Sequence, residues 1–455
     1  MSDAPLVTST ARRFLALGTL AGRVGASLLT ARVADLARGR DARATNRAEV
    51  LVRNATRVVE TLGRLKGGAM KLGQMLSLHA ELLPPGVADV LSALQKSAPS
   101  VPSEVMEGEA RLALRHFDEL FATFDPVPFA SASIGQVHGA TLRDGRRVAV
   151  KIQYPAIDQI LRADLSNLRT VMASLFGMFS DADFTPIWGE IRDRLLEELD
   201  YTREADLLRR VAALHAHVPE IVIPAVIDEA TTRTVLTMEY VPGIAPDAAC
   251  SDRYPQDLRN RWGVVVFEWL FRGLFEHRLL HADPNFSNLA FREDGRVVVY
   301  DMGCVKEVPT PVALGYARLL RAVLDGRGGD IPGILGDMGI GFADGSPIPS
   351  EITTPFLELF QGMVADGTPY TFGTDATLYE RVFALGWQHA GDAAEVRFPP
   401  DIVFVHRTLG GHFGNLGRLR ATAHWREVAL GVLDRVPGTV LAASSGAARR
   451  GRRNS

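Results

Sequence analysis

The segment from His281 to Asn288, together with the turn Asp301–Gly303, constrains this chain more than any other feature. Asn288 follows Asp283 by five residues, and Asp301 follows Asn288 by thirteen. Carboxylate and amide oxygens are good ligands for Mg²⁺, and a Gly two residues after the second Asp lets the backbone turn beside a charged ligand. The pattern predicts that Asn288 and Asp301 bind metal and that Asp283 faces the attacking oxygen. The alternative is a chance pattern, since Asp and Asn are common in loops.

A strand further upstream points to the same chemistry. The spacing of Asp283, Asn288 and Asp301 is typical of a kinase catalytic loop and metal turn. Lys151 lies in a Val-Ala-Val-Lys-Ile segment, which matches the kinase strand whose Lys contacts the α- and β-phosphates of the nucleotide. An edge-strand Lys that only solvates the sheet is the alternative. A helix Glu usually holds this Lys. We predict Glu204 for that role, although it lies 53 residues later, so the helices between them must be an insertion.

The segment before Lys151 is predicted to cover the nucleotide phosphates. Ordinary kinases use several glycines there, whereas this chain has mostly Ala and Ser, which makes the loop stiffer. The alternative is a polar surface turn. The predicted nucleotide-binding residues of the loop are Ala130, Ser131, Ala132, Ser133, Ile134, Gly135, Gln136 and Val137. Backbone groups of Glu239 and Val241, in a predicted hinge before a Pro-Gly turn, are expected to pair with the adenine edge.

Hydrophobic periodicity divides the chain into three kinds of region. Helical spacing predicts helices over 46–80, 86–97, 103–120, 156–180 and 186–215. Strand character is predicted over 137–142, 148–152, 222–227, 234–240, 289–291 and 297–299. Asp-Gly pairs at 144–145 and 294–295 predict tight hairpin turns. The order of helices, a β-rich lobe and an α-rich lobe predicts an α+β fold with two lobes.

Five motifs in order identify a family resemblance. They are Lys71-Leu72-Gly73-Gln74, Ala130–Gln136, Glu198-Leu199-Asp200, His281-Ala282-Asp283 and Asp301-Met302-Gly303. Together they resemble the ABC1 family of atypical kinases, also called UbiB or AarF proteins, and most closely its ADCK/COQ8-like branch. The resemblance implies a protein-kinase-like fold that uses ATP and Mg²⁺, with Lys151, Glu204 and Asp283 as catalytic residues.

The resemblance also implies a domain plan. We expect a basic, amphipathic lead (1–45), a helical extension with the KxGQ motif (46–122), an N-lobe with a helical insertion (123–241), a helical C-lobe (242–445) and a basic tail (446–455). In the family the KxGQ helix covers the nucleotide cleft where a peptide binds in ordinary kinases. That lid would bring Lys71 to Glu198 or Asp200, with Gly73 and Gln74 in the same motif. An exposed helix Lys is the alternative for Lys71.

The chain departs from ordinary protein kinases in two places. Met302 replaces the Phe of the metal turn and is expected to fill the same apolar slot. Asn285 stands where protein kinases carry a Lys that steadies the γ-phosphate, which disfavours fast transfer to protein. Residues 306–455 are predicted to be family-specific helices, and the cluster His406–Gly411 has no assigned role, with Arg407 read as structural.

These observations favour an ATP- and Mg²⁺-dependent atypical kinase or ATPase that supports ubiquinone biosynthesis by hydrolysis or small-molecule phosphorylation. The ubiquinone link comes from the resemblance alone. The alternative is a nucleotide-gated scaffold that binds lipids or partner enzymes with little turnover. A small-molecule kinase like the aminoglycoside phosphotransferases shares the catalytic loop, but the KxGQ and alanine-rich motifs disfavour it.

Charge and hydropathy limit the partners. The net charge of −3 gives no global basic field for nucleic acid. The sequence contains no run of 18 apolar residues, so it predicts no transmembrane helix. Residues 1–66 hold twelve Lys or Arg against five Asp or Glu, which predicts either a solvated helix face or reversible contact with an anionic membrane. We therefore expect a cytoplasmic protein with peripheral contact at a bacterial inner membrane, and isoprenoid-quinone precursors or lipids as partners beside ATP.

Overall fold

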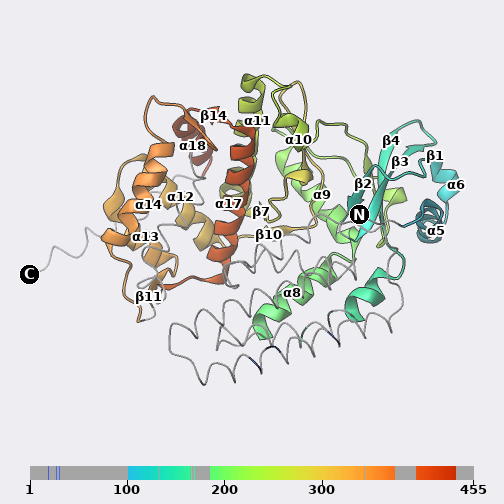
Figure 1. Cartoon of the computed structure of the whole chain (residues 1–455), viewed down its shortest axis with the longest axis horizontal. Helices are drawn as coiled ribbons and strands as arrows, with labels where there is room; N and C mark the ends of the chain where they lie inside the picture. Colours follow the sequence, from blue (N-terminus) through green and yellow to red (C-terminus); the bar gives the residue numbers. More distant parts are fainter. Residues whose placement is uncertain are drawn as a thin grey trace, which may run out of the picture. The chain divides into compact units, whose positions relative to one another are not determined.

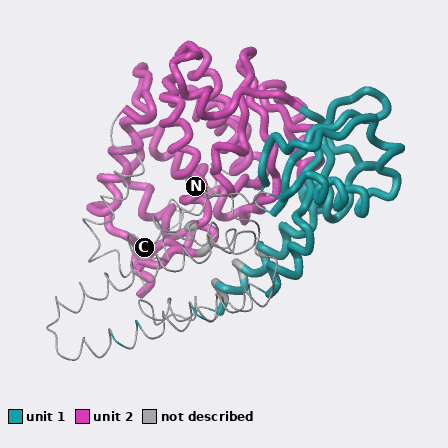
Figure 2. Tube along the Cα trace, turned by 45° about the vertical axis from the view of Figure 1, so that its right-hand side comes forward, with its two compact units in different colours: residues 1–206, 225–240 teal, residues 207–224, 241–455 magenta. Residues whose placement is uncertain are grey.

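The computed structural model describes residues 101–132, 134–163, 185–342, 344–374 and 396–436, with single residues at 19, 27, 30, 165 and 169 (Figure 1). The chain divides into two compact units, drawn teal and magenta in Figure 2. Unit 1 covers residues 1–206 and 225–240, and unit 2 covers residues 207–224 and 241–455. The predicted lid residues Lys71, Gly73 and Gln74, and Ser133 of the alanine-rich loop, lie outside the described residues.

Unit 1 is built on an antiparallel sheet. Its strands are β1 (Phe121–Phe124), β2 (Ala130–Ala132), β3 (Gly135–Leu142), β4 (Arg147–Gln153) and β6 (Val235–Glu239). The strand order is β1-β3-β4-β6, and β2 pairs with β3. The Asp144-Gly145 turn joins β3 to β4 with Gly145 at φ +90°, a region that only glycine adopts readily. The hairpin predicted from the sequence is confirmed.

The helices of unit 1 correct two sequence predictions. The helix expected over 103–120 begins at Ser103 as predicted, but it is two helices, α5 (Ser103–Ala113) and α6 (Phe117–Leu120). Leu114 is extended between them, which lets Phe117 pack its ring 4.9 Å from that of Phe121. The helix expected over 186–215 is likewise α8 (Thr185–Glu197) and α9 (Tyr201–His215), with a turn between them. Helix α9 runs from unit 1 into unit 2.

Unit 2 is mainly helical. Its α-helices are α10 (Pro246–Ala249), α11 (Gln256–Phe271), α12 (Thr310–Leu324), α13 (Ile331–Asp337), α14 (Ser350–Met363), α17 (Pro400–Leu419) and α18 (Trp425–Leu433). The long helix α17 packs against α11, and the π-helix η4 (Arg272–His277) continues α11 directly (Figure 1). Trp262 of α11 and Trp425 of α18 are fully buried, so α11 forms the centre of this core.

Short strands of unit 2 carry the motif loops. They are β5 (Ile221–Val222), β7 (Leu279–His281), β8 (Leu289–Phe291), β9 (Val297–Val299) and β10 (Val305–Glu307). Two further pairs consist of two-residue strands: β11 (Gly341–Phe342) pairs with β13 (Val396–Arg397), and β12 (Tyr370–Thr371) pairs with β14 (Thr422–Ala423). The β8–β9 hairpin is confirmed, with Gly295 at φ +93°. The strand predicted over 222–227 is wrong in length, since β5 ends at Val222 and only Val226 forms an isolated bridge afterwards. No helix in the described part of the chain is long and apolar enough to cross a membrane.

Candidate functional site

Lys151 and Glu204 form a buried ion pair in unit 1. Nζ of Lys151 lies 2.8 and 2.9 Å from the two carboxylate oxygens of Glu204, and the side chains are 10% and 6% exposed. The ring of Tyr201 lies 5.0 Å from the same ammonium group. A buried charge is tolerated only when it is paired and hydrogen-bonded. The pairing predicted across 53 residues therefore has the geometry of a held, oriented lysine.

The turn between α8 and α9 fixes the helix that carries Glu204. Oδ1 of Asp200 accepts hydrogen bonds from the backbone N–H (3.0 Å) and hydroxyl (2.6 Å) of Thr202, so Asp200 caps α9. Gln153, at the end of β4, donates to the carbonyl of Leu199 at 3.0 Å. Because β4 also carries Lys151, these bonds fix Glu204 relative to the lysine it holds. Glu198 lies half-buried in the same turn.

The alanine-rich segment forms β2 and the start of β3. Ala130 and Ser131 are exposed, Ala132 is half-buried, and Ile134 is buried. A Cβ at Gly135 would lie 2.1 Å from the carbonyl oxygen of Ile152, so only glycine fits there.

The next two residues of β3 face opposite sides of the sheet. Val137 pairs with Lys151, whereas Gln136 pairs with Ile152, and directly paired residues share one face. The amide of Gln136 is buried and donates to the carbonyl of Val101 at 3.3 Å. The structure thus brings Val137 to the Lys151 side and turns Gln136 away from it.

The predicted adenine-pairing residues have part of their backbone already bonded. The N–H of Glu239 donates to the carbonyl of Ala225 at 2.8 Å. The carbonyl of Val241 accepts a hydrogen bond from the hydroxyl of Tyr300, also at 2.8 Å.

The catalytic loop in unit 2 brings Asp283 and Asn288 together. Oδ1 of Asp283 accepts from the backbone N–H of Asn285 at 3.0 Å, and Oδ2 accepts from Nδ2 of Asn288 at 3.0 Å. Because the Asn288 amide nitrogen faces Asp283, its carbonyl oxygen is the atom that can coordinate metal. Asn285 accepts from the N–H of Ser287 at 3.1 Å and caps the 3₁₀ turn η5 (Phe286–Asn288). Asn285 therefore shapes the loop.

The metal turn is tied to the catalytic loop at several points. Oδ1 of Asp301 accepts from the N–H of Gly303 at 2.7 Å, and Met302 is fully buried. Nε2 of His281 donates to the carbonyl of Asp301 at 2.6 Å. The strands β7 and β10 pair, with His281 opposite Val305.

Oxygen donors at this site suit Mg²⁺. Asn288 and Asp301 offer an amide oxygen and a carboxylate, and Mg²⁺ commonly binds one or two such groups together with substrate phosphates and waters. Among the described residues, no group of three or more His, Cys, Asp or Glu side chains could hold a metal by itself. The donor set fits an ion held jointly with a phosphate ligand.

Comparison with known proteins identifies the family. Residues 93–329 match the ABC1 atypical kinase-like domain. The chain belongs to this family. It is 31% identical over 382 residues to the mitochondrial atypical kinase coq-8 of Caenorhabditis elegans, covering 81% of this chain. It is 30% identical over 391 residues to the mitochondrial atypical kinase COQ8B of Rattus norvegicus, covering 82% of this chain and 71% of the rat protein. The chain spans about half the length of the worm protein, 49%.

A solved structure supports the same assignment. The Rv3197–erythromycin complex from Mycobacterium tuberculosis matches with a TM-score of 0.62 and 25% identity, covering 86% of this chain and 98% of that one. The predicted ABC1 membership and the two-lobed kinase-like fold class are confirmed.

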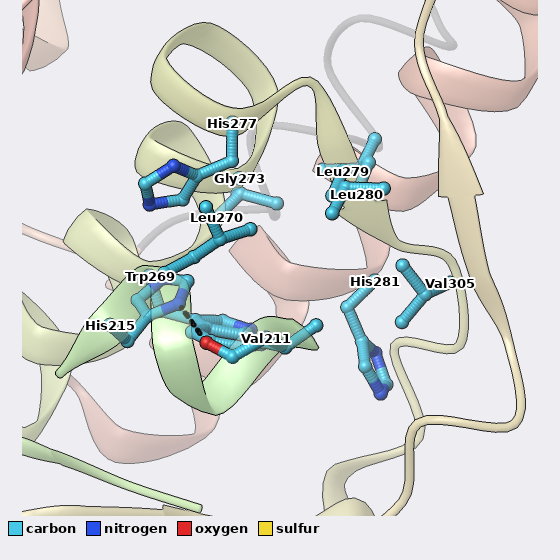
Figure 3. A pocket seen from close by; sticks show the side chains of 11 residues that line it. Val211, His215, Trp269, Leu270, Gly273, His277, Leu279, Leu280, His281 and Val305 are labelled. Carbon is cyan, nitrogen blue, oxygen red and sulfur yellow. Dashed lines mark hydrogen bonds between the residues drawn. The ribbon is translucent and has the colours of Figure 1, made fainter. Parts of the chain in front are cut away.

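An apolar hollow in unit 2 of this ABC1 protein, beside His281 of the catalytic-loop motif, does not fit a nucleotide (Figure 3). It is lined by Val211, Leu214, His215, Trp269, Leu270, Gly273, His277, Leu279, Leu280, His281 and Val305. The lining contains no Lys or Arg to bind phosphate. Nδ1 of His215 donates to the carbonyl of Val211 at 3.0 Å, and burial lowers the pKa of His215 to about 4. We interpret the hollow as a packing defect beside the core.

Sequence reasoning treated His281 only as part of the catalytic-loop motif. Its ring fixes the carbonyl of Asp301, twenty residues later, and its position two residues before Asp283 is the signal for that role in the sequence. Tyr300, which bonds the carbonyl of Val241, carried no signal beyond its place beside the metal turn.

Proposed function

We propose that this ABC1 protein is an ATP- and Mg²⁺-dependent atypical kinase or ATPase that supports ubiquinone (isoprenoid-quinone) biosynthesis. The observation that carries the proposal is the buried Lys151–Glu204 pair at 2.8 Å. A lysine held in this way is a standard phosphate-binding device of kinases. The relatives named coq-8 and COQ8B support the quinone link.

Each predicted residue has a defined role in this proposal. Lys151 binds the α- and β-phosphates, and Glu204 orients it. Asn288 and Asp301 hold Mg²⁺, which neutralises charge on the phosphates when it is bound. The alanine-rich segment, from Ala130 to Gly135, covers the phosphates together with Val137, while Gln136 faces the other side of the sheet.

Backbone groups at the hinge form hydrogen bonds with the adenine ring. The Glu239 carbonyl and the Val241 N–H are the proposed contacts, because the Glu239 N–H and the Val241 carbonyl already have partners. These two groups provide one acceptor and one donor, which matches the edge of adenine.

Asp283 acts on the attacking group. The bond between the γ-phosphorus and the ADP oxygen breaks as a new bond forms to the oxygen of water or of a small hydroxyl compound. Asp283 accepts the proton from that oxygen. The amide of Asn288, bonded to Oδ2 of Asp283, holds the carboxylate in one orientation.

The acceptor is water or a small molecule rather than a protein. Asn285 occupies the position of the γ-phosphate Lys of protein kinases, and its side chain is committed to capping η5. The proposed lid adds to this restriction. Lys71, Gly73 and Gln74 would cover the peptide-binding region, with Lys71 paired to Glu198 or Asp200. Reversible contact of the basic N-terminal region with an anionic membrane completes the proposal.

The test is ATP hydrolysis by the purified protein with Mg²⁺, with and without anionic liposomes and a phenol-type quinone precursor. We expect lipid-stimulated turnover that Asp301→Asn lowers by at least about 100-fold. Asp294→Asn is the matched control, because Asp294 lies in the exposed β8–β9 turn and bonds only Arg residues nearby. Nucleotide binding without turnover under every condition would reject the enzyme and favour the nucleotide-gated scaffold.

A further inference from the structure

One side of helix α17 packs against the catalytic loop and against β10, the strand after the metal turn. Residues on this loop-facing side recur at helical spacing, three or four apart. They are Asp401, Phe404, Thr408, Gly411, Asn415 and Arg418. All except Thr408 have a described contact with the catalytic loop or with β10, although these partners lie 95 or more residues earlier in the chain.

The central contact of this side is with Pro284, the residue directly after Asp283. Nδ2 of Asn415 donates to the carbonyl of Pro284 at 2.8 Å, and Asn415 is 6% exposed. A Cβ added at Gly411 would lie 2.4 Å from both Cβ and Cγ of Pro284. The proline ring is rigid, so any side chain at residue 411 has to push the loop backbone and α17 apart.

The two ends of the loop-facing side make charged contacts. Asp401 lies 3.3 Å from Nζ of Lys306, and the ring of Phe404 lies 4.6 Å from the same ammonium group. Lys306 belongs to β10, which pairs with the strand β7 that enters the catalytic loop. At the other end, the guanidinium of Arg418 lies 4.9 Å from the ring of Phe286. Helix α17 therefore contacts the loop after Asp283 and the strand that leaves the metal turn.

Ordinary helix packing is the simpler interpretation of these contacts. It accounts for the buried apolar residues of α17, but it does not require a side-chain amide aimed at a loop carbonyl. A carbonyl that is partly shielded from water needs a hydrogen-bond partner, and Asn415, which is itself buried, supplies one next to Asp283. The glycine at 411 weakens a helix by about 1 kcal/mol relative to alanine, and the close approach of Pro284 leaves no room for a side chain there.

We propose that Gly411 and Asn415 are positioning residues, which set the backbone of the catalytic loop at Pro284 and thereby the orientation of Asp283. This inference rests on the proposed function of Asp283. It gives a role to the end of the His406–Gly411 cluster and to a helix beyond the motif region.

Two glycines of α17 allow a matched test. Gly411→Ala and Gly414→Ala make the same change three residues apart, and a Cβ at residue 414 would meet nothing within 4 Å. Both variants gain about the same helix propensity. We expect Gly411→Ala to lower kcat for ATP turnover about tenfold or more, with the Kd for MgATP within about twofold of wild type. Gly414→Ala should leave both constants unchanged.

A second measurement does not need turnover. Hydrogen–deuterium exchange of residues 283–289 reports directly on the backbone of the loop. We expect faster exchange there in Gly411→Ala and Asn415→Leu, and wild-type exchange in Gly414→Ala and in Thr408→Val. Thr408 is a suitable control because its hydroxyl bonds only the carbonyl of Phe404 within α17.

The two measurements separate this inference from the proposed function. If the wild type turns over no ATP, the proposed function fails, and exchange alone decides whether α17 positions the loop. Unchanged loop exchange in both Gly411→Ala and Asn415→Leu would overturn the inference. Equal loss of kcat in Gly411→Ala and Gly414→Ala would overturn it too, because the effect would then belong to the helix and not to Pro284.

Discussion

At the scale of single residues, the Lys151–Glu204 pair is a buried ion pair whose energetic cost calls for an explanation. Both side chains are nearly buried, and Glu204 accepts both of the hydrogen bonds that Nζ donates to it. Burying two charges costs free energy that their attraction only partly offsets. Hydrophobic residues of similar size are often at least as stabilising, so the proposed role in binding phosphate gives a reason for the pair that stability does not.

Removing one partner should destabilise the protein. Glu204→Gln leaves the Lys151 ammonium buried without its counter-charge, and we expect a loss of about 3 kcal/mol in the free energy of unfolding. The double variant Lys151→Met, Glu204→Gln should recover most of that loss. Urea denaturation measures both.

The matched control is Glu307→Gln, which removes an exposed partner of Arg210. We expect that change to stay within about 0.5 kcal/mol of wild type. A loss in Glu204→Gln no larger than in this control would show that the buried pair is not energetically coupled.

His215 predicts how stability depends on pH. Burial lowers its pKa from 6.5 to about 4, and the neighbours that act on it are His277, Arg272 and Glu276. Below pH 6.5 the unfolded chain binds a proton that the folded imidazole does not take up until about pH 4, so stability is lost across that window. We expect the free energy of unfolding to fall by about 2 kcal/mol from this residue between pH 7 and pH 5.

Urea denaturation at both pH values compares wild type with His215→Gln. The variant lacks the titrating group and should show a smaller pH-dependent loss. Equal losses in the two proteins would contradict the assignment of this effect to His215.

At the scale of secondary-structure elements, local turn chemistry was predictable and long-range breaks were not. The two Asp-Gly hairpins follow from a preference that acts within four residues. The break between α8 and α9 combines the local cap at Asp200 with the bond from Gln153 to the carbonyl of Leu199, 46 residues away. Helical periodicity continues through that break, so the sequence alone predicted one helix.

The same limit explains what was missed at the site. The pairing of Lys151 with Glu204 was predicted from motif chemistry, and the structure shows it. The contact of Asn415 with Pro284 spans 131 residues and matches no motif, so its role needed the structure. The face occupied by Gln136 could not be assigned either, because it depends on the register of β3 against β4.

The β3–β4 turn gives an element-scale prediction. Gly145 has φ +90°, so Gly145→Ala should cost about 1–2 kcal/mol in the free energy of unfolding. The control is Gly431→Ala in α18, where a Cβ meets nothing within 4 Å and helix propensity should rise. Thermal denaturation should therefore move the two variants in opposite directions. A stabilised Gly145→Ala would contradict the turn geometry.

At the scale of the whole molecule, the two units carry different parts of the proposed chemistry. Unit 1 contains Lys151 with Glu204, and unit 2 contains Asp283, Asn288 and Asp301. The chain passes from unit 1 to unit 2 within α9, soon after Glu204, returns to unit 1 after Pro224, and enters unit 2 again after Tyr240. Family membership explains why both sets of residues occur in one chain.

The most direct test of that account is calorimetric binding of ATP with and without Mg²⁺. We predict that wild type binds ATP at least about tenfold more tightly with Mg²⁺, and that Asp301→Asn loses this difference while Asp294→Asn keeps it. Binding that does not depend on Mg²⁺ in wild type, or no binding at all, would contradict the account.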